Sequence, residues 1–126
     1  MREIAIDTET TGLSYKNGDR IIELGCVELV NYVSTGNTLN FYCKVNKKIS
    51  TDAKKITGIS DEFLSDKQTF EEQHLQFLNF IKNDKLVIHN ADFDLGFLNN
   101  ELKLMGKQEL QNEVIDTVKL ARKTLN

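Results

Sequence analysis

The apolar segments of this chain occur in an order that few folds allow. Three strand-like runs come first, at residues 3–7, 20–30 and 39–46, and helical and strand-like runs then alternate. In the third run, Leu39, Phe41, Cys43 and Val45 alternate with more polar neighbours, which is the period of a half-buried strand. Residues 34–37 (STGN) form a turn cluster before it. We expect these three strands to form an antiparallel meander.

Helical periodicity dominates the second half. Phe70, His74, Phe77 and Ile81 recur on one helical face, which predicts a helix with His74 in a structural role. The segments expected after it are a strand at 86–88, a helix at 91–105 ended by Gly106, a strand at 114–115, and a helix at 116–125 with Asp116 as N-cap. This order predicts an α/β fold, a mixed sheet flanked by helices with ligands near the strand ends.

Length and composition limit the class of protein. The 126 residues suffice for one domain with its own core. No apolar run could span a bilayer and no signal-peptide pattern follows Met1, so we expect a cytoplasmic protein without a membrane partner. The net charge of -3 argues against a wide duplex-binding surface, but not against a site that holds a few nucleotides through metal ions. Cys26 and Cys43 should be buried free thiols.

The strongest chemical signal is DTETTGL, residues 7–13, after an apolar strand. Asp7 and Glu9 are two residues apart, so an extended chain projects both carboxylates to one side. Their repulsion would be relieved by a divalent cation with hard oxygen ligands. A solvated acidic turn is the alternative for the Asp-x-Glu pair alone. The threonines and Gly12 that follow favour a ligand site, because they let the backbone approach a ligand closely.

A second signal is HNADFD, residues 89–94, between the strand at 86–88 and the next helix. Asp94 lies in the first turn of that helix, where an acid also compensates the helix dipole. We give Asp92 that simpler role, since it points to a different side. Asn90 is a natural N-cap, and His89 fits a packing residue before the helix.

Together these motifs resemble the first two motifs of the DEDD (DnaQ-like) superfamily of 3′–5′ exonucleases. Residues 56–64 (ITGISDEFL) resemble the segment that members place beside the substrate, and residues 114–122 (VIDTVKLAR) also fit. The resemblance spans nearly the whole chain. Within the superfamily it is greatest to the epsilon family of proofreading subunits of bacterial DNA polymerase III. It implies a ribonuclease H-like fold.

The resemblance also assigns site residues. It makes Asp7, Glu9 and Asp94 the catalytic acids that bind two divalent metal ions, Mg²⁺ or Mn²⁺, so we expect them to converge on one site. The residues that it places against the 3′-terminal nucleotide are Thr8, Thr10, Thr11, Gly12, Leu13, Ile56, Thr57 and Phe93. Thr57 stands where many relatives have His, which could remove one substrate contact.

The family's third motif, a His followed five residues later by an Asp, would lie beyond Asn126. We therefore expect residues 1–126 to be an exonuclease domain that is incomplete at its C-terminus and weakly active or inactive alone. Segments that contact the polymerase III catalytic subunit and the sliding clamp would also be absent.

The implied reaction removes the last nucleotide of a single-stranded or frayed DNA 3′ end as a monophosphate. Two alternatives are a DEDD nuclease that trims RNA or oligonucleotides, and a catalytically incomplete interaction module. The retained acids argue against the second of these.

Overall fold

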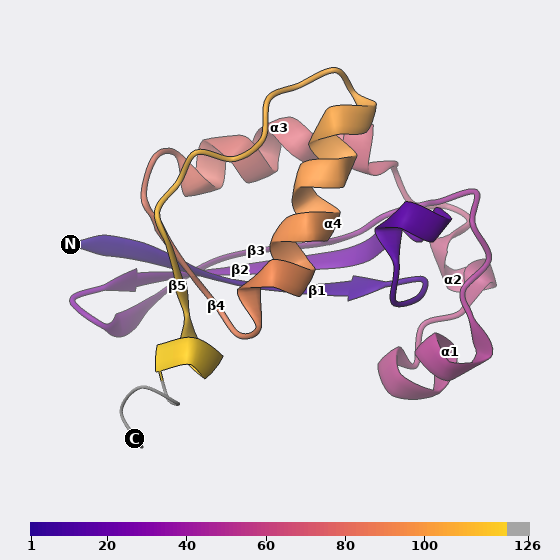
Figure 1. Cartoon of the computed structure of the whole chain (residues 1–126), viewed down its shortest axis with the longest axis horizontal. Coiled ribbons are helices and arrows are strands. Elements are labelled where there is room, and N and C mark those ends of the chain that lie inside the picture. The colour runs from indigo at the N-terminus through magenta and orange to yellow at the C-terminus, as the bar shows by residue number, and fades with distance from the viewer. Residues whose placement is uncertain (121–126) are drawn as a thin grey trace.

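The centre of the molecule is a five-stranded mixed sheet (Figure 1) in a computed structural model that describes residues 1–120. The strands are β1 (Arg2–Thr10), β2 (Ile21–Val30), β3 (Val33–Tyr42), β4 (Lys85–Ile88) and β5 (Val114–Asp116), in the order β3-β2-β1-β4-β5. β1, β2 and β3 pair in an antiparallel meander, whereas β4 pairs parallel to both β1 and β5. The predicted fold class is therefore confirmed.

Two longer helices cover one face of this sheet (Figure 1). They are α3 (Phe70–Ile81) and α4 (Ala91–Leu104), and their inward residues form the main core with Ile4, Ile6, Leu86 and Ile88 of the strands. Burying a large apolar side chain contributes about 1.5–3 kcal/mol, so this layer supplies most of the hydrophobic stabilisation.

The shorter helices gather at one end of the sheet (Figure 1). They are the 3-10 helix η1 (Tyr15–Asn17), α1 (Thr51–Thr57) and α2 (Asp61–Leu64). Ile22 of β2 forms a second apolar cluster with Ile49, Ile59 and Leu64. This cluster fixes the segment between β3 and α3 beside the end of β1, where the first motif lies.

The sequence explains where α3 begins and what it buries. Thr69 and Glu72 form a capping box, in which each side chain accepts a hydrogen bond from the other residue's backbone N–H. His74 is buried on the core face, and its Nδ1 lies 2.6 Å from the carbonyl oxygen of Glu71, to which it donates. His74 is thus structural, as its position in the apolar pattern predicts.

The turn between β2 and β3 was predicted wrongly. It lies at Asn31 and Tyr32, whose φ angles are 51° and 71°, and the predicted turn cluster at residues 34–37 lies inside β3. A two-residue hairpin needs positive φ at both central positions, which Asn-Gly usually supplies. Here strand pairing imposes a positive φ on Tyr32, so the residue types at this turn did not predict it.

Three further features can be compared with the sequence within the described residues. Cys26 and Cys43 are free and buried, as predicted. No helix in residues 1–120 is both long and apolar enough to cross a membrane. Residues 117–120 form a helical turn, and Asp116 caps it by accepting from the backbone N–H of Val118 at 2.9 Å. The rest of the predicted final helix lies outside the described residues.

Candidate active site

The two acids of the first motif lie within β1, two residues apart on one face. The sequence predicted that this strand would end at Asp7, but it continues to Thr10. The reason is its antiparallel pairing with β2, in which Asp7 faces Gly25 and Glu9 faces Glu23. The pKa of Glu9 is raised by its burial, and further by the negative charges of Asp7 and Glu23.

Asp94 approaches this strand from the first turn of α4. Asp94 is 6% exposed, and its Oδ1 accepts a hydrogen bond of 3.0 Å from the Thr8 hydroxyl. Burial raises the pKa of Asp94 to about 6; the Thr8 hydrogen bond opposes this rise, and the charges of Asp7 and Glu9 add to it. All three acids of the two motifs therefore interact electrostatically at one end of the sheet.

The N-terminus of α4 is capped differently from the prediction. Asn90 has a left-handed backbone (φ 59°, ψ 59°), and its side chain makes no capping hydrogen bond. Asp116 of β5 provides the cap, since its Oδ2 accepts from the backbone N–H of Ala91 at 3.0 Å. Asp116 thus holds the helix that carries Asp94 from a position 22 residues further along the chain.

The other polar residues of the second motif lie outside this contact. His89 is exposed rather than packed, and its Nδ1 lies 3.0 Å from the Thr117 hydroxyl oxygen. Asp92 is also exposed, 3.6 Å from the ammonium group of Lys119. Asp92 lies in the first turn of α4, the position from which an acid can compensate the helix dipole, and that role stays a prediction.

A half-buried carboxylate shapes the loop after β1. Asp19 accepts hydrogen bonds from the Thr11 hydroxyl at 2.9 Å and from the backbone N–H of Ser14 at 3.1 Å. A Cβ on Gly12 would lie only 2.5 Å from an Asp19 carboxylate oxygen. Gly12 is therefore required so that Asp19 can fold the loop back on itself. Sequence reasoning did not single out Asp19, because one acid in a loop carries no distinctive pattern.

This loop, β1, the α1 region and α4 enclose a cavity of about 860 Å³. Of the eight residues predicted to contact the substrate, seven line it: Thr8, Thr10, Gly12, Leu13, Ile56, Thr57 and Phe93. Leu13 and Ile56 are 86% and 79% exposed, so they present apolar surface at its mouth. The eighth, Thr11, is fully buried and does not line the cavity.

The acids relate to the cavity unequally. Glu9 lines it, whereas Asp7 and Asp94 lie beside it. Asp7, Glu9 and Asp94 have the right chemistry to bind a divalent cation, because carboxylates are hard oxygen ligands and a cation would relieve their mutual repulsion. Within residues 1–120, however, no three His, Cys, Asp or Glu side chains are grouped closely enough to hold a metal ion. The three acids lie in one region of the structure, but they are not grouped as a complete set of metal ligands.

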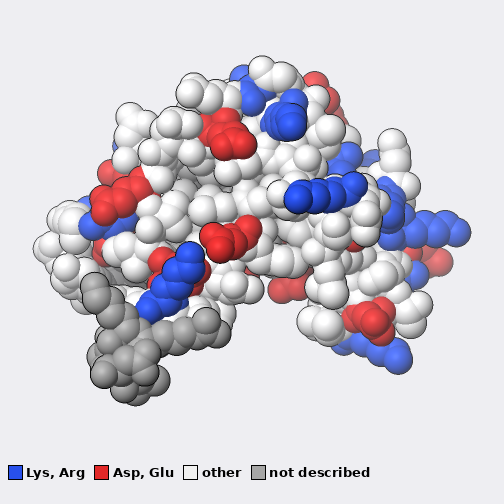
Figure 2. All heavy atoms as spheres, in the orientation of Figure 1, with Lys and Arg blue, Asp and Glu red and all other residues white. Residues whose placement is uncertain are grey.

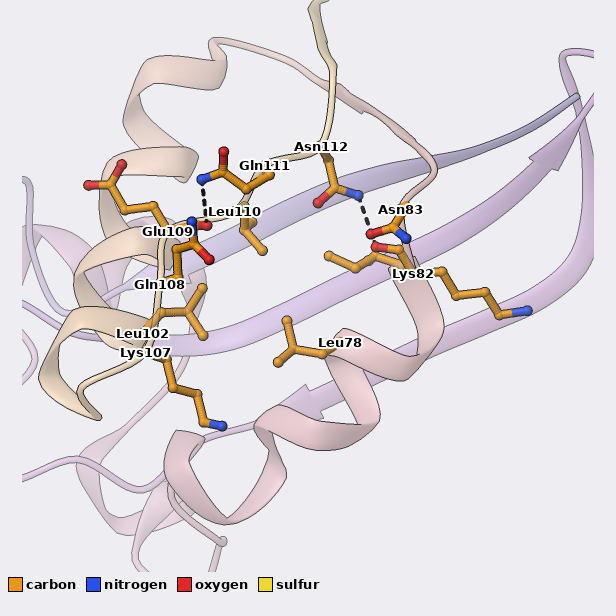
Figure 3. A pocket seen from close by; sticks show the side chains of 11 residues that line it. Leu78, Lys82, Asn83, Leu102, Lys107, Gln108, Glu109, Leu110, Gln111 and Asn112 are labelled. Carbon is orange, nitrogen blue, oxygen red and sulfur yellow. Dashed lines mark hydrogen bonds between the residues drawn. The ribbon is translucent and has the colours of Figure 1, made fainter.

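A second cavity, of about 480 Å³, lies between the C-terminal ends of α3 and α4 and the loop before β5 (Figure 3). Leu78, Ile81, Leu102 and Leu110 give it aliphatic walls, and lysine and amide side chains surround them. It contains no predicted site residue. The first cavity is therefore the candidate active site.

Residues 4–126 match the family model of the RNase_T exonucleases, so the chain belongs to this exonuclease family. Membership implies dependence on divalent metal ions. Among curated proteins, the chain is similar to the DNA polymerase III subunit epsilon of Buchnera aphidicola subsp. Schizaphis graminum, with 47% identity over 97% of this chain and 56% of that protein. The same subunit of Rickettsia felis is also 47% identical, over 97% of this chain and 55% of that protein. The chain thus spans about half the length of the curated relatives it matches.

Solved structures support the same fold. Exonuclease X, solved in complex with 5′ overhanging duplex DNA, has a TM-score of 0.76 and 27% identity, over 97% of this chain and 63% of that chain. Escherichia coli exonuclease I, solved with a dA16 oligonucleotide, has a TM-score of 0.84 over 97% of this chain and 29% of that chain. Because its sequence identity is 18%, this second similarity supports the fold alone. The expected ribonuclease H-like architecture agrees with both.

Proposed function

We propose that this chain carries the catalytic carboxylates of a metal-dependent 3′–5′ exonuclease that acts on single-stranded or frayed DNA 3′ ends. The observation that carries this proposal is the cavity lined by Glu9 and flanked by the interacting charges of Asp7 and Asp94. Residues 1–126 would belong to one exonuclease domain. Likeness to the epsilon subunits supports proofreading in the cytoplasm, with the polymerase III catalytic subunit and the sliding clamp as partners.

Asp7, Glu9 and Asp94 would hold two divalent ions, Mg²⁺ or Mn²⁺. Such ions supply positive charge that polarises the scissile phosphate and offsets the charge of the three acids. The chain itself contributes the placement of the acids. Pairing of β1 with β2 fixes Asp7 and Glu9, and the Thr8 hydroxyl holds the carboxylate of Asp94 towards β1.

The terminal nucleotide would occupy the cavity itself. Leu13, Ile56 and Phe93 provide apolar surface against which a nucleobase can pack. Gly12 also lines the cavity, where the loop backbone can lie beside the sugar. A base must leave its duplex partner to enter such a cavity, and a mismatched base does so at lower cost. Selection of frayed ends follows from that difference.

The test compares two aspartates of one helix. Asp94→Asn removes a proposed metal ligand, whereas Asp92→Asn removes an exposed carboxylate two residues away. The substrate is a 5′-labelled DNA strand with a mismatched 3′ end, and the products are resolved nucleotide by nucleotide with Mg²⁺, with Mn²⁺ and with EDTA. Mn²⁺ binding, followed by electron paramagnetic resonance, gives a second readout that needs no turnover.

We expect slow shortening from the 3′ end that EDTA abolishes. Asp94→Asn should reduce it by at least about 10²-fold and weaken Mn²⁺ binding, since even residues that only support a metal ligand are worth 10–100-fold. Asp92→Asn should resemble the unchanged chain. Equal effects of the two substitutions on Mn²⁺ binding would show that Asp94 is not a metal ligand. Faster shortening of an RNA strand than of DNA would favour the RNA-trimming alternative.

A further inference from the structure

Positive charge is concentrated between the end of β3 and the end of α1. Residues 44–55 include five lysines and one aspartate, a formal charge of +4, so the rest of a chain with net charge -3 carries -7. Figure 2 shows Lys and Arg side chains on the side of the molecule where Figure 1 places η1 and α1. A local excess in an acidic protein favours binding of an anionic ligand on that side.

These lysines differ in their contacts. The Lys54 Nζ pairs with an Asp61 carboxylate oxygen at 2.8 Å, and Lys54 does not line the candidate active site. The Lys47 Nζ donates to the Asn17 carbonyl oxygen at 3.1 Å, so it joins two loops at the cavity wall. Neither of these lysines is fully available to a ligand.

Lys44 does not line the candidate active site, which leaves Lys48 and Lys55. Both line the candidate active site and both are exposed. Within residues 1–120 neither has a hydrogen-bond or ion-pair partner. The cavity therefore has Glu9 in its wall beside Asp7 and Asp94, and two available ammonium groups in the segment that also contributes the carboxylate of Asp52. A ligand that suits both parts needs one anionic group near the acids, where metal ions would bind, and further anionic groups near the lysines.

A single nucleotide has only its own phosphate, whereas a strand repeats phosphates along its length. We propose that Lys48 and Lys55 bind backbone phosphates upstream of the terminal nucleotide, so that the DNA strand leaves the cavity past α1. This assignment rests on the proposed function and adds to it the path of the strand. It also explains how an acidic protein holds a polyanion, since attraction is confined to one wall.

The experiment measures affinity against strand length for the whole chain. Unlabelled dTMP, the thymidine dinucleotide and the tetranucleotide compete with a 5′-fluorescein tetranucleotide, with Ca²⁺ replacing Mg²⁺ to slow hydrolysis. The test variants are Lys48→Gln and Lys55→Gln. The matched control is Lys54→Gln, which removes the same charge one residue away but outside the cavity. Titrations at several salt concentrations give the salt dependence.

The unchanged chain should bind the tetranucleotide more tightly than dTMP. Each test substitution should weaken tetranucleotide binding about 3–10-fold, leave dTMP binding unchanged, and reduce the salt slope by about 0.7 for a lost phosphate contact. Lys54→Gln should retain the length dependence. Equal losses for all three variants, or equal losses for dTMP and the tetranucleotide, would overturn the assignment. An unchanged chain that binds neither ligand would overturn the proposed function as well.

Discussion

Replacement of Glu101 should cost more stability than replacement of any exposed acid, because it leaves charged and polar groups unpaired. The Glu101 side chain is 2% exposed, and its two oxygens accept hydrogen bonds of 2.6 and 2.8 Å from the Arg20 guanidinium. The backbone N–H of Ile21 donates to the same carboxylate at 3.3 Å. Glu101 therefore ties α4 to the start of β2.

The magnitude follows from what Glu101→Ala would leave behind. Removing one partner of a buried ion pair costs about 3–5 kcal/mol. The Arg20 side chain is 32% exposed, so water can partly solvate it after the change, whereas the N–H of the buried Ile21 loses its acceptor. We therefore expect a loss of about 2–4 kcal/mol, or a melting temperature lower by about 3–6 °C per kcal/mol.

Urea unfolding followed by circular dichroism measures this change. Glu113→Ala is the control, because Glu113 is 74% exposed and 3.9 Å from the Lys85 ammonium group. The control should change the free energy of unfolding by less than about 0.5 kcal/mol. The double variant with Arg20→Ala should lose less than the sum of the single losses. A Glu101→Ala protein within about 1 kcal/mol of the unchanged chain would refute this account.

Three further results are expected. Burial raises the pKa of Cys26 to about 12, and burial, assisted by Glu101, raises that of Cys43 to about 12, so neither thiol should react with Ellman's reagent at pH 8 until urea unfolds the chain; prompt reaction of the native protein would contradict this. Gly12→Ala should cost about 1–3 kcal/mol in urea, because its Cβ would lie 2.5 Å from an Asp19 oxygen; an unchanged midpoint would show that the loop relaxes freely. Backbone N–H donors lower the pKa of Asp116, although burial opposes this shift. The unchanged chain should therefore have a higher free energy of unfolding than Asp116→Asn at neutral pH, and this difference should be lost as the pH falls below about 4, where the carboxyl of the unfolded chain also protonates. A stability difference independent of pH would contradict the capping role.

Local patterns were sufficient to predict most elements. The spacing of Phe70, His74, Phe77 and Ile81 predicted a helix, and α3 contains all four, because one apolar face determines where such a helix packs. Gly106, with φ 72°, follows α4 as predicted, since glycine adopts that conformation without strain. α1 and α2 were not predicted as helices. They are short, and Ser50 and Ser60 cap them, but few apolar positions recur in them.

The sequence was less informative about contacts between distant segments. The first motif predicted that Asp7 and Glu9 share one side of an extended chain, because that depends only on strand geometry. Nothing near Asn90 indicated that a β5 residue would cap α4. Nothing near Thr11 indicated that its hydroxyl would donate to Asp19 inside the loop. Each of these contacts depends on which segments the sheet brings together.

The position of Asp94 shows why contacts between distant segments matter for function. The second motif places an acid in the first turn of α4, but the helix could rotate or slide without further restraint. Asp116 fixes the N-terminal end of α4 through Ala91, and Arg20 fixes its inward face through Glu101, seven residues after Asp94 and therefore on the same side. Residues of β5 and β2 thus determine the position of an acid whose chemical identity comes from the motif. Substitutions at Asp116 or Arg20 should consequently affect the candidate site without touching any residue of it.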